Sequence, residues 1–589
     1  MGRYTTHTAP AWARMFIEQL HKVLGISVKQ LFQMAVLPPQ KDMGDLAVPL
    51  FLAAKEQKQS PALLAQTLSA QIPNTKAQGP YLNYFACRSQ VLVDTISQVQ
   101  TQGSKFAQTP VSPRRVAVID YSSPNIAKPL AFHHIRSTMI GSALHRILTA
   151  DGYTVHAINY LGDWGTQFGY IIQALSHKSK EDIESMSLNA LVQVYVDERK
   201  KAEQNPQIHE YARQAFARLE QKDARARDIW QIAKKITLRQ FKDVYARLGV
   251  SFTEENYIGE SFFEPDLVPV IQELQDKHIA TTSEGALIVD LKEENIDAPC
   301  LIRKADGATL YATREIASAR YRYYHYTKSI SDWNPSQDEW VALYVVDQGQ
   351  ALHFKQLKAV LKKMKEPFYE HLIHVPFGVL LLWSEEEQSW MKGKTRSGNA
   401  ILLEDVLNEA QKRVLSIIDE KNPLLPHKAE IADKIGVGAI IFNDLKNKRT
   451  NDVKFKFEDA LALEGETGPY VHNALVRTKS IIKKAQTVIA MESTPDLSVL
   501  VHPRELEIAM ILADYQSIIH EAASTFDPSL IARYLLQLAG AFHAFHHDCL
   551  VIDTQAQVLS RARLALTEAV LTVLESAMYL IGLQSIEAM

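Results

Sequence analysis

Val116-Ala-Val-Ile-Asp120 is a short apolar run rich in β-branched residues, and it predicts a buried strand. A loop over residues 121–129 follows. The next apolar residues recur at helical spacing: Ile135, Met139, Ile140, Ala143, Leu144, Ile147 and Leu148. Thr154–Tyr160 predicts a second strand. This strand–loop–helix–strand order is the opening of a Rossmann-like, doubly wound parallel α/β sheet.

Around this sheet the chain divides into three parts. Residues 1–110 contain amphipathic helical segments and lead into a linker at Ser104–Arg115. Residues 111–420 form the sheet domain. Residues 421–589 have helical periodicity almost throughout, which predicts a separate all-α bundle. We therefore expect a multidomain α/β protein.

The sheet domain contains a large insertion. Residues 170–290 are mostly insertion, of which residues 170–247 are polar and helical in pattern, rich in Lys, Glu, Gln and Arg. Strand residues return at Ala286–Leu291 and again at Val341–Val346. The insertion therefore separates the two halves of the predicted sheet.

Composition limits the kinds of partner. The chain has 589 residues, of which 46% are hydrophobic, so it can bury several cores. Lys and Arg number 64 against 67 Asp and Glu, which gives a net charge of −3. This balance provides no global attraction to nucleic acid, so any RNA contact must come from local basic patches.

The cysteines and the N-terminus indicate the compartment. Cys87, Cys300 and Cys549 have no paired spacing, which argues against a disulfide framework and fits a reducing cytoplasm. Residues 1–24 lack the continuous apolar segment of a secretory signal. No run of about 18 uncharged apolar residues is present to span a membrane. We expect a cytoplasmic protein.

The segment after the first strand has the composition of an anion-binding loop. It reads Ser122-Ser-Pro-Asn-Ile-Ala-Lys128-Pro-Leu-Ala-Phe-His133-His134-Ile-Arg136-Ser-Thr138. Free N–H groups and the helix dipole favour a phosphate where such a loop enters a helix. The sequence has no Walker A motif, which excludes a P-loop NTPase. A lysine, two histidines and an arginine are the groups offered instead.

This segment resembles the signature region of arginyl-tRNA synthetases, where Ser-Ser-Pro-Asn-x-Ala-Lys leads into His-x-Gly-His and then Leu-Arg-Ser-Thr. The resemblance continues over most of the chain, in Asn159–Gly169, Lys304–Arg314, Tyr344–Gln356, Leu403–Val406, Gly436–Leu445 and Glu464–Tyr470. Several long motifs in the same order are far more specific than any one of them. The family is class I, with a Rossmann-like catalytic domain.

The resemblance implies where ATP binds and which groups act on it. The ATP-binding residues implied are Lys128, Ala131, Phe132, His133 and His134. The catalytic residues implied are Lys128, His134, Lys392, Lys394 and Arg396. The last three correspond to a mobile second signature, whose cations neutralise charge that develops on the pyrophosphate.

Two positions of the first signature depart from the family. Ala131 replaces its first histidine, and His133 replaces the glycine that lets adenine approach the backbone. Three interpretations of His133 stay open. It caps the helix without chemistry, it replaces near the phosphates the imidazole missing at Ala131, or it partly blocks the adenine pocket.

The resemblance also implies an arginine pocket. A guanidinium is a planar fork of five donors, so a selective pocket needs carboxylates, neutral acceptors and a flat wall. The arginine-binding residues implied are Asp120, Ser123, Asn125, His134, Tyr311, Glu315 and Gln350. Tyr311 and Glu315 are one helical turn apart and share a face. The family usually has aspartate where this chain has Glu315, which keeps the charge but is one methylene longer.

For RNA, the resemblance implies an N-terminal module that grips the tRNA elbow and a C-terminal bundle that recognises the anticodon. Arg477, Lys479 and Lys483 are the expected tRNA-binding residues. Arg320–Lys328 interleaves basic and aromatic residues and is a second candidate. The family's usual Tyr-Val-Gln-Tyr is Tyr470-Val-His472-Asn473 here.

These observations predict an arginine–tRNA ligase that forms arginyl-adenylate from L-arginine and Mg²⁺-ATP and transfers the arginyl group to tRNA(Arg). We expect a monomer, with no membrane contact and no protein-bound metal, although His543, His546, His547 and Asp548 have helical spacing. One alternative is a paralogue with weak or lost adenylation that binds tRNA or arginine. Another is an enzyme that hands the acyl group to a different acceptor.

Overall fold

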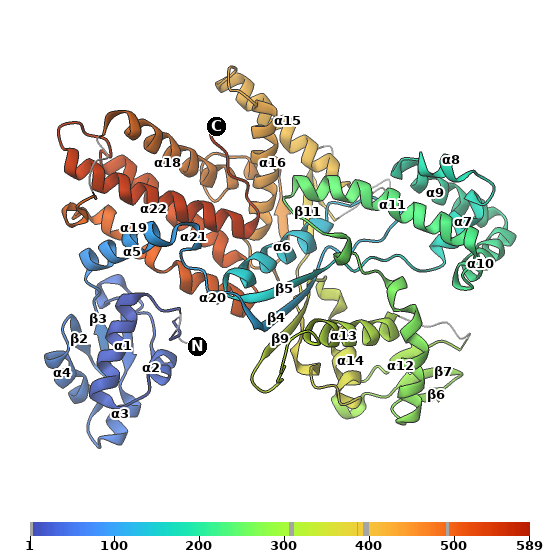
Figure 1. Cartoon of the computed structure of the whole chain (residues 1–589), viewed down its shortest axis with the longest axis horizontal. Coiled ribbons are helices and arrows are strands. Elements are labelled where there is room, and N and C mark those ends of the chain that lie inside the picture. Colours follow the sequence, from blue (N-terminus) through green and yellow to red (C-terminus); the bar gives the residue numbers. More distant parts are fainter. Residues whose placement is uncertain (1–3, 7, 306–310, 386, 393–399, 490–493) are drawn as a thin grey trace. The chain divides into compact units, whose positions relative to one another are not determined.

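The computed structural model describes residues 4–6, 8–305, 311–385, 387–392, 400–489 and 494–589. The chain forms two compact units. Residues 111–461 make up the sheet unit, and residues 1–110 together with 462–589 make up the helical unit. Figure 1 labels their helices and strands.

The sheet unit is built on four parallel strands in the order β10-β9-β4-β5. These strands are β4 (Ser112–Asp120), β5 (Tyr153–Ile158), β9 (Glu339–Tyr344) and β10 (Leu372–His374). After β4 the chain crosses to β5 on one side and only later reaches β9 on the other. The predicted α/β sheet is confirmed, and its topological switch point lies between β4 and β9.

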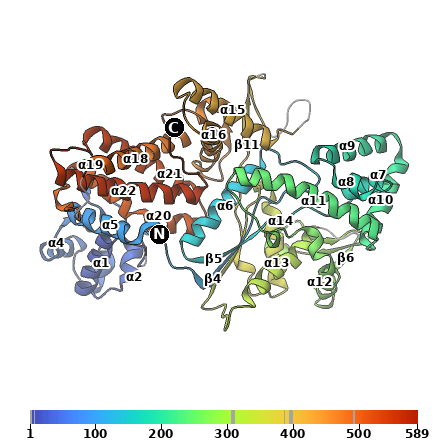
Figure 2. The same ribbon diagram turned by 45° about the horizontal axis from the view of Figure 1, so that its top comes forward.

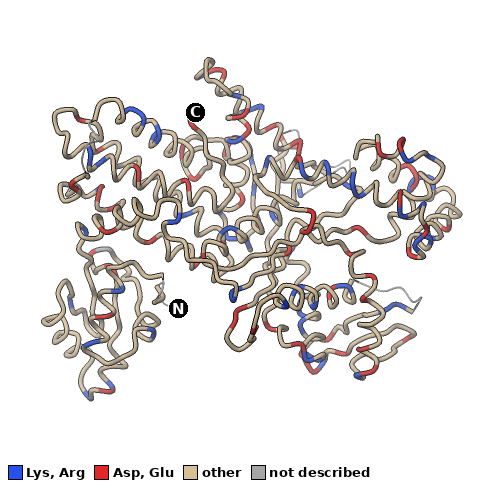
Figure 3. The backbone as a smooth tube through the Cα atoms, in the orientation of Figure 1, with Lys and Arg blue, Asp and Glu red and all other residues tan. Residues whose placement is uncertain are grey.

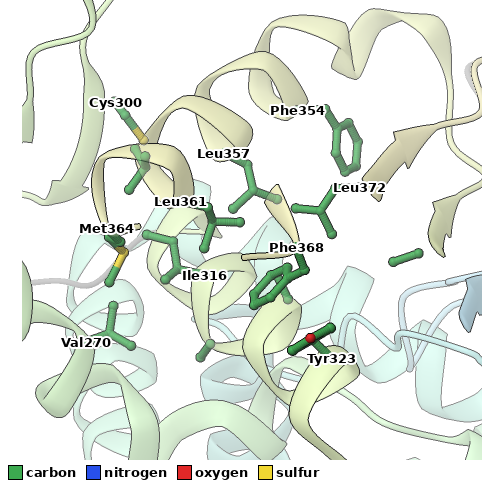
Figure 4. Close-up of a cluster of buried hydrophobic side chains, with 14 of the residues drawn as sticks. Val270, Cys300, Ile316, Tyr323, Phe354, Leu357, Leu361, Met364, Phe368 and Leu372 are labelled. Atoms are coloured by element: carbon green, nitrogen blue, oxygen red, sulfur yellow. The ribbon is translucent and has the colours of Figure 1, made fainter. Parts of the chain in front are cut away.

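Helices cover the sheet and bury its strands. Val116 and Val118 of β4 belong to a core that also contains residues of α13 (Tyr311–Thr327) and α14 (Ala351–Lys363). Figure 4 shows part of that core, where Ile316, Leu357 and Phe368 converge. Side chains alternate along a strand, so Ala117 and Ile119 point to the other face, toward α6 (His134–Ala150). This burial on both faces explains the uninterrupted apolar run of β4.

The insertion begins with five helices, α7 (Gln167–Leu175), α8 (Lys180–Glu184), α9 (Leu188–Gln204), α10 (Pro206–Glu220) and α11 (Ala224–Arg247). In both ribbon views, α7 to α10 gather at one end of α11 (Figures 1 and 2). Basic and acidic residues are interspersed along these helices (Figure 3). A mixed surface of this kind fits the polar composition of the insertion.

The second part of the insertion has strands of its own. α12 (Glu264–Asp276) is followed by β6 (Thr281–Ser283), β7 (Ala286–Val289) and β8 (Cys300–Arg303). These strands form a separate antiparallel sheet in the order β6-β7-β8. The strand predicted from Ala286 is therefore present, but outside the parallel sheet. Its alternating burial matches a sheet covered on one face only.

A third small sheet follows β10. It comprises β11 (Leu380–Ser384), β12 (Ser389–Met391) and β13 (Val453–Phe455), in the order β12-β11-β13. Between β12 and β13 the chain forms two long helices, α15 (Leu403–Lys421) and α16 (Lys428–Leu445). These two helices pack tightly against each other. A Cβ added at Gly436 of α16 would lie 2.9 Å from the backbone of Ala410 in α15.

Helices α15 and α16 lie within the sheet unit, which extends through residue 461. The sequence pattern places the start of the bundle at residue 421, because helical periodicity begins there. In the structure α16 contacts α6, and the ion pair between Arg136 and Asp444 joins the two helices. Helical periodicity alone cannot tell which neighbour a helix packs against.

The helical unit combines both ends of the chain. Its N-terminal part has helices α1 (Ala11–Leu24), α2 (Val28–Met34), α3 (Phe51–Glu56) and α4 (Pro61–Gln71) and strands β1 (Leu46–Pro49), β2 (Thr75–Gln78) and β3 (Tyr81–Tyr84). The strands form an antiparallel sheet in the order β1-β3-β2. α5 (Arg88–Gln102) then leads toward the linker.

The C-terminal part of this unit is all helical, with α18 (Gly468–Val488), α19 (Pro503–Ala513), α20 (Tyr515–Thr525), α21 (Ser529–Asp548) and α22 (Gln557–Ile581). α5 packs against α19 and α22. Of the described helices, only α22 is long and apolar enough to cross a membrane, and 67% of its apolar window is buried in the structure. That burial is expected of the central helix of a bundle.

Candidate active site

A pocket of about 430 Å³ opens at the switch point of the parallel sheet. Segments that follow β4, β9 and β10 line it, together with the first turn of α6. The lining residues that carry the argument below are Ser123, His133, His134, Asp347, Gly378 and Lys392. Ligands of open α/β sheets bind at this position, outside the carboxyl ends of the strands.

The loop after β4 has an unusual backbone. Ser122, Ser123 and Ala127 have positive φ angles of 70°, 46° and 58°. Non-glycine residues rarely adopt this region, and such conformations cluster at ligand sites. Ser123 donates a hydrogen bond of 2.6 Å to Asp120 Oδ1, and its own amide donates to Asn159 Oδ1 at 3.1 Å. These contacts fix the loop at the end of β4.

Asn125 lies against a close-packed backbone. A Cβ added at Gly162 would be 1.9 Å from Asn125 Oδ1, so glycine is required there. The two residues also form an isolated parallel bridge. The loop implied to bind the α-amino group of arginine is thus held by the segment after β5.

His134 is the first residue of α6 and is a neutral imidazole. Its Nδ1 accepts a hydrogen bond of 2.9 Å from the Ala131 amide. Burial, together with the nearby His133 and Lys128, lowers the pKa of His134 to about 4, although the hydrogen bond with the Ala131 backbone opposes the shift. Nδ1 also lies 3.1 Å from Ala131 O, so the tautomer sets its role; where Nδ1 accepts from the Ala131 amide, Nε2–H is the donor available to a phosphate oxygen in the pocket.

His133 lines the pocket and lies beside His134, with 4.3 Å between the ring centroids. Burial lowers the pKa of His133, whereas the charge of Asp347 opposes that shift. Ala131 and Phe132 are buried, and the Phe132 ring packs against Phe455. Of residues 131–134, the two histidines therefore line the pocket and Ala131 and Phe132 do not.

The second signature begins at the same pocket. Lys392 lines the pocket, whereas Lys394 and Arg396 lie outside the described residues. After that signature the chain is bonded to the first one, because the Phe132 amide donates to Ile401 O at 2.8 Å and the Leu403 amide donates to Leu130 O at 2.9 Å. Lys128 is exposed on the loop.

Beside this pocket, carboxylates surround a buried guanidinium. Arg322 of α13 is fully buried and donates a hydrogen bond of 2.6 Å to Asp120 Oδ2. Its guanidinium lies 4.4 Å from the ring centroid of Tyr344. Asp120 is thus hydrogen-bonded through both oxygens, to Ser123 and to Arg322.

Glu315 lies on the same helix and differs sharply from Asp120. Its side chain is buried, and neither carboxylate oxygen forms a hydrogen bond of good geometry among the described residues, although the nearby Tyr311 hydroxyl favours the ionised form. Burial raises the pKa of Glu315 to about 7, although the charge of Arg322 opposes the shift. Burial and the charges of Glu315 and Asp120 also raise the pKa of Tyr311 well above its usual value. A buried, unpaired carboxylate is costly, and a cation would relieve that cost.

Two members of this set, Arg322 and Glu260, were not predicted from the sequence as parts of the site. Arg322 reads in the sequence as part of a basic, aromatic surface stretch. Glu260 carries no periodic signal, yet burial raises its pKa to about 7 and its charge acts on Glu315. Gln350, in contrast, is exposed at the start of α14 and does not line the 430 Å³ pocket.

The RNA candidates on α13 are largely engaged within the protein. Arg320 forms ion pairs with Glu273 and Glu366, and Arg322 is buried against Asp120. The interpretation of this stretch as an RNA-contacting surface is therefore wrong for its two arginines. The alternating aromatics pack into the core beside α13 or onto one another.

In the bundle, the three predicted tRNA-binding residues differ in their surroundings. Arg477 and Lys483 are exposed on α18. Lys479 is 16% exposed and forms ion pairs with Glu575 and Glu587. Over the described parts of the chain, no group of three or more His, Cys, Asp or Glu side chains is placed to bind a metal ion.

Three family models match successive parts of this chain. The model "Arginyl tRNA synthetase N terminal domain" matches residues 11–86. The model "tRNA synthetases class I (R), catalytic domain" matches residues 95–457. The model "DALR anticodon binding domain" matches residues 471–589.

Individual proteins agree with these models. The arginine–tRNA ligase of Clostridium perfringens is 36% identical over 98% of this chain and 100% of its own length. That of Levilactobacillus brevis is 40% identical over 94% of this chain and 95% of its own. Among solved structures, the arginyl-tRNA synthetase of Thermus thermophilus matches with a TM-score of 0.76 at 24% identity, covering 98% of this chain and all of its own. That of Plasmodium falciparum gives 0.76 at 20%, covering 99% and 100%.

Proposed function

This chain belongs to the arginyl-tRNA synthetase family, and we propose that it charges tRNA(Arg) with L-arginine through the site at the β4–β9 switch point. A carboxylate oxygen of arginine attacks the α-phosphate of the Mg²⁺-ATP substrate, and pyrophosphate leaves. The terminal ribose hydroxyl of the tRNA then takes the arginyl group from the adenylate, and AMP leaves. Neither step needs a covalent protein nucleophile, so positioning and charge stabilisation provide the catalysis.

The observation that carries this proposal is the state of Glu315. It is a buried carboxylate whose oxygens form no hydrogen bond of good geometry among the described residues, and only the Tyr311 hydroxyl and the charge of Arg322 favour its ionised form there. A substrate guanidinium supplies both the positive charge and the planar donors that this carboxylate lacks. Asp120 is already bonded to Arg322, so Glu315 is the better partner for the substrate.

The nucleotide occupies the adjacent 430 Å³ pocket in this proposal. His134 donates from Nε2 to a phosphate oxygen, and Lys392 supplies positive charge as the pyrophosphate leaves. Lys128, Lys394 and Arg396 add to that charge. His133 faces the same pocket opposite Asp347, which supports a role near the phosphates in place of the imidazole missing at Ala131.

The helical unit binds the tRNA in this proposal, with its N-terminal part at the elbow and α18 to α22 at the anticodon. Arg477 and Lys483 are exposed and available to phosphates. We further infer a cytoplasmic monomer. The described structure leaves all three cysteines as free thiols, which suits a reducing compartment.

The test is ATP–pyrophosphate exchange with arginine, measured with and without tRNA(Arg), followed by direct aminoacylation. We expect arginine-dependent exchange when tRNA is present, and charging of the tRNA. Tight tRNA or arginine binding without exchange would instead assign the chain to a binding paralogue, which the bulk of His133 in the pocket favours as the second candidate.

A further inference from the structure

Arg136 is a buried arginine whose guanidinium binds three backbone carbonyls. It lies in the first turn of α6, two residues after His134, and is 1% exposed. Its Nη1 donates to Gly378 O at 2.7 Å and to Asn451 O at 2.9 Å, and its Nη2 donates to Arg449 O at 3.2 Å. Its Nε lies 2.8 Å from Asp444 Oδ1 in an ion pair.

The three carbonyls belong to two neighbouring backbone segments, residue 378 and residues 449–451, which lie just before β11 and β13. The line of contact between these segments is called the seam below. A Cβ added at Gly378 would be 2.5 Å from Asn451 O, so the two backbones touch there. The Val379 amide donates to Asp452 Oδ1 at 2.7 Å, and the Val453 amide donates to Val379 O at 2.8 Å. β11 and β13 begin directly after these contacts and run parallel.

This seam is the base of the hairpin that leads to the second signature. β11 pairs with β12, β12 ends at Met391, and Lys392 follows at once. Gly378 and Lys392 both line the nucleotide pocket, opposite the turn that contains His134. Arg136, which itself lines the pocket, therefore joins the first turn of α6 to the base of the hairpin.

We propose that Arg136 is a positioning residue for the nucleotide, which fixes the separation between the His134 turn and the hairpin that ends at Lys392. This inference rests on the proposed function of the pocket. In this role the guanidinium acts through the protein rather than on ATP: Nη1 and Nη2 bind the three carbonyls, and the charge is paired with Asp444.

Only an arginine satisfies these partners together. A guanidinium presents five donors in a rigid plane, so one side chain can bind several carbonyls at fixed spacing. A lysine keeps the charge for Asp444 but is a flexible point donor. Arg136→Lys should thus preserve the buried charge pair while loosening the seam, which separates positioning from simple loss of charge.

The experiment compares Arg136→Lys and Arg136→Met with Arg115→Met. Arg115 is a matched control, because it forms ion pairs with Asp151 and Glu339 at the opposite end of β4. Pyrophosphate exchange gives kcat and the KM values for ATP and arginine. Hydrogen exchange measures the amides of residues 378–384 and 453–455 in the same proteins without substrate.

We expect Arg136→Lys to lower kcat/KM for ATP by about tenfold or more, since small displacements of reacting groups are costly. The arginine KM should stay near that of the parent, and hydrogen exchange should quicken in both segments. Arg115→Met should lower thermal stability without this split. If Arg136→Met does not fold, Asp444→Asn serves in its place, with faster exchange at residues 378–384 expected.

Equal changes in the ATP and arginine KM values, or parent-like hydrogen exchange at residues 378–384 in Arg136→Lys, would overturn the positioning role. An inactive parent would contradict the proposed function instead. Hydrogen exchange would still test in that case whether Arg136 stabilises the seam, because the measurement needs no turnover.

Discussion

Arg322 donates a hydrogen bond of 2.6 Å to Asp120, and both side chains are buried at the carboxyl end of β4. Glu315 lies two helical turns before Arg322 on α13 and so shares its face. The protein's own guanidinium thus occupies one carboxylate of the site. The neighbouring Glu315 lacks such a partner among the described residues.

Glu315→Gln should severely reduce the use of arginine, because a desolvated guanidinium would lose its charged partner. Removing one member of such a pair costs roughly 2–5 kcal/mol, which should be seen in kcat/KM for arginine. The KM for ATP should change little. Normal kinetics with arginine would show that Glu315 is not part of the pocket.

Arginine binding should weaken as the pH falls through about 7. Burial raises the pKa of Glu315 to about 7, so the free protein carries a proton there below that pH. Binding a guanidinium requires the ionised form and therefore releases the proton. Affinity should fall by up to about tenfold per pH unit below 7 and level off above it. Isothermal titration in buffers of different ionisation enthalpy measures both the affinity and the proton release. In Glu315→Gln this pH dependence should disappear.

His133→Gly should lower the rate of pyrophosphate exchange if His133 contributes to phosphate binding. We expect a loss of about tenfold in kcat/KM for ATP, less than the roughly 100- to 1000-fold cost of losing one preorganised oxyanion donor, because other cations of the site remain. Ala131→His in the glycine variant should restore part of the rate. A glycine variant that gains activity and has a lower ATP KM would show that His133 obstructs adenine instead.

Arg477→Ala and Lys479→Ala should affect tRNA binding differently. Arg477 is exposed, so its loss should weaken tRNA affinity and reduce the salt slope of log Kd by about one. Lys479 is engaged with Glu575 and Glu587, so its loss should leave that slope nearly unchanged. Filter binding over a series of salt concentrations distinguishes the two. Equal slopes for both variants would count against this difference.

Deleting residues 1–86 should separate tRNA binding from small-molecule binding better than deleting residues 1–110. α5 packs against α19 and α22, and its Leu92 and Ile96 are fully buried. Removing residues 1–110 should therefore lower the Tm of the helical unit. Removing residues 1–86 should mainly weaken tRNA affinity and leave arginine and ATP binding intact. Similar Tm values for both truncations would contradict this role of α5.

The parts of the fold that the sequence predicted are those with strong local patterns. β4 and β9 contain uninterrupted apolar runs, β5 is rich in residues that favour strands, and each was predicted close to its place. β10, β12 and β13 have three residues each, too few for a pattern, and β11 has only five. Short strands depend on their neighbours rather than on their own residues.

The same distinction applies to the site. The loop after β4 and the His134 turn are contiguous, so sequence motifs could find them. Arg322 could not be found this way, because its partner Asp120 is 202 positions away and arginines between tyrosines look exposed. The ion pairs of Lys479, an expected tRNA-binding residue, could not be predicted for the same reason, since its carboxylate partners lie about a hundred residues later.

The pairing of β4 with β9 also sets the order in which the chain can fold during synthesis. Arg115 lies opposite Glu339, 224 positions further along, and all residues between them must leave the ribosome first. At typical rates of translation that interval lasts tens of seconds. Throughout it, one edge of β4 lacks its neighbour, and unpaired strand edges promote aggregation. The helices α7 to α11 depend mainly on local contacts, so they can form during the wait. The open edge of β4 during this interval is therefore a place where aggregation of the growing chain can begin.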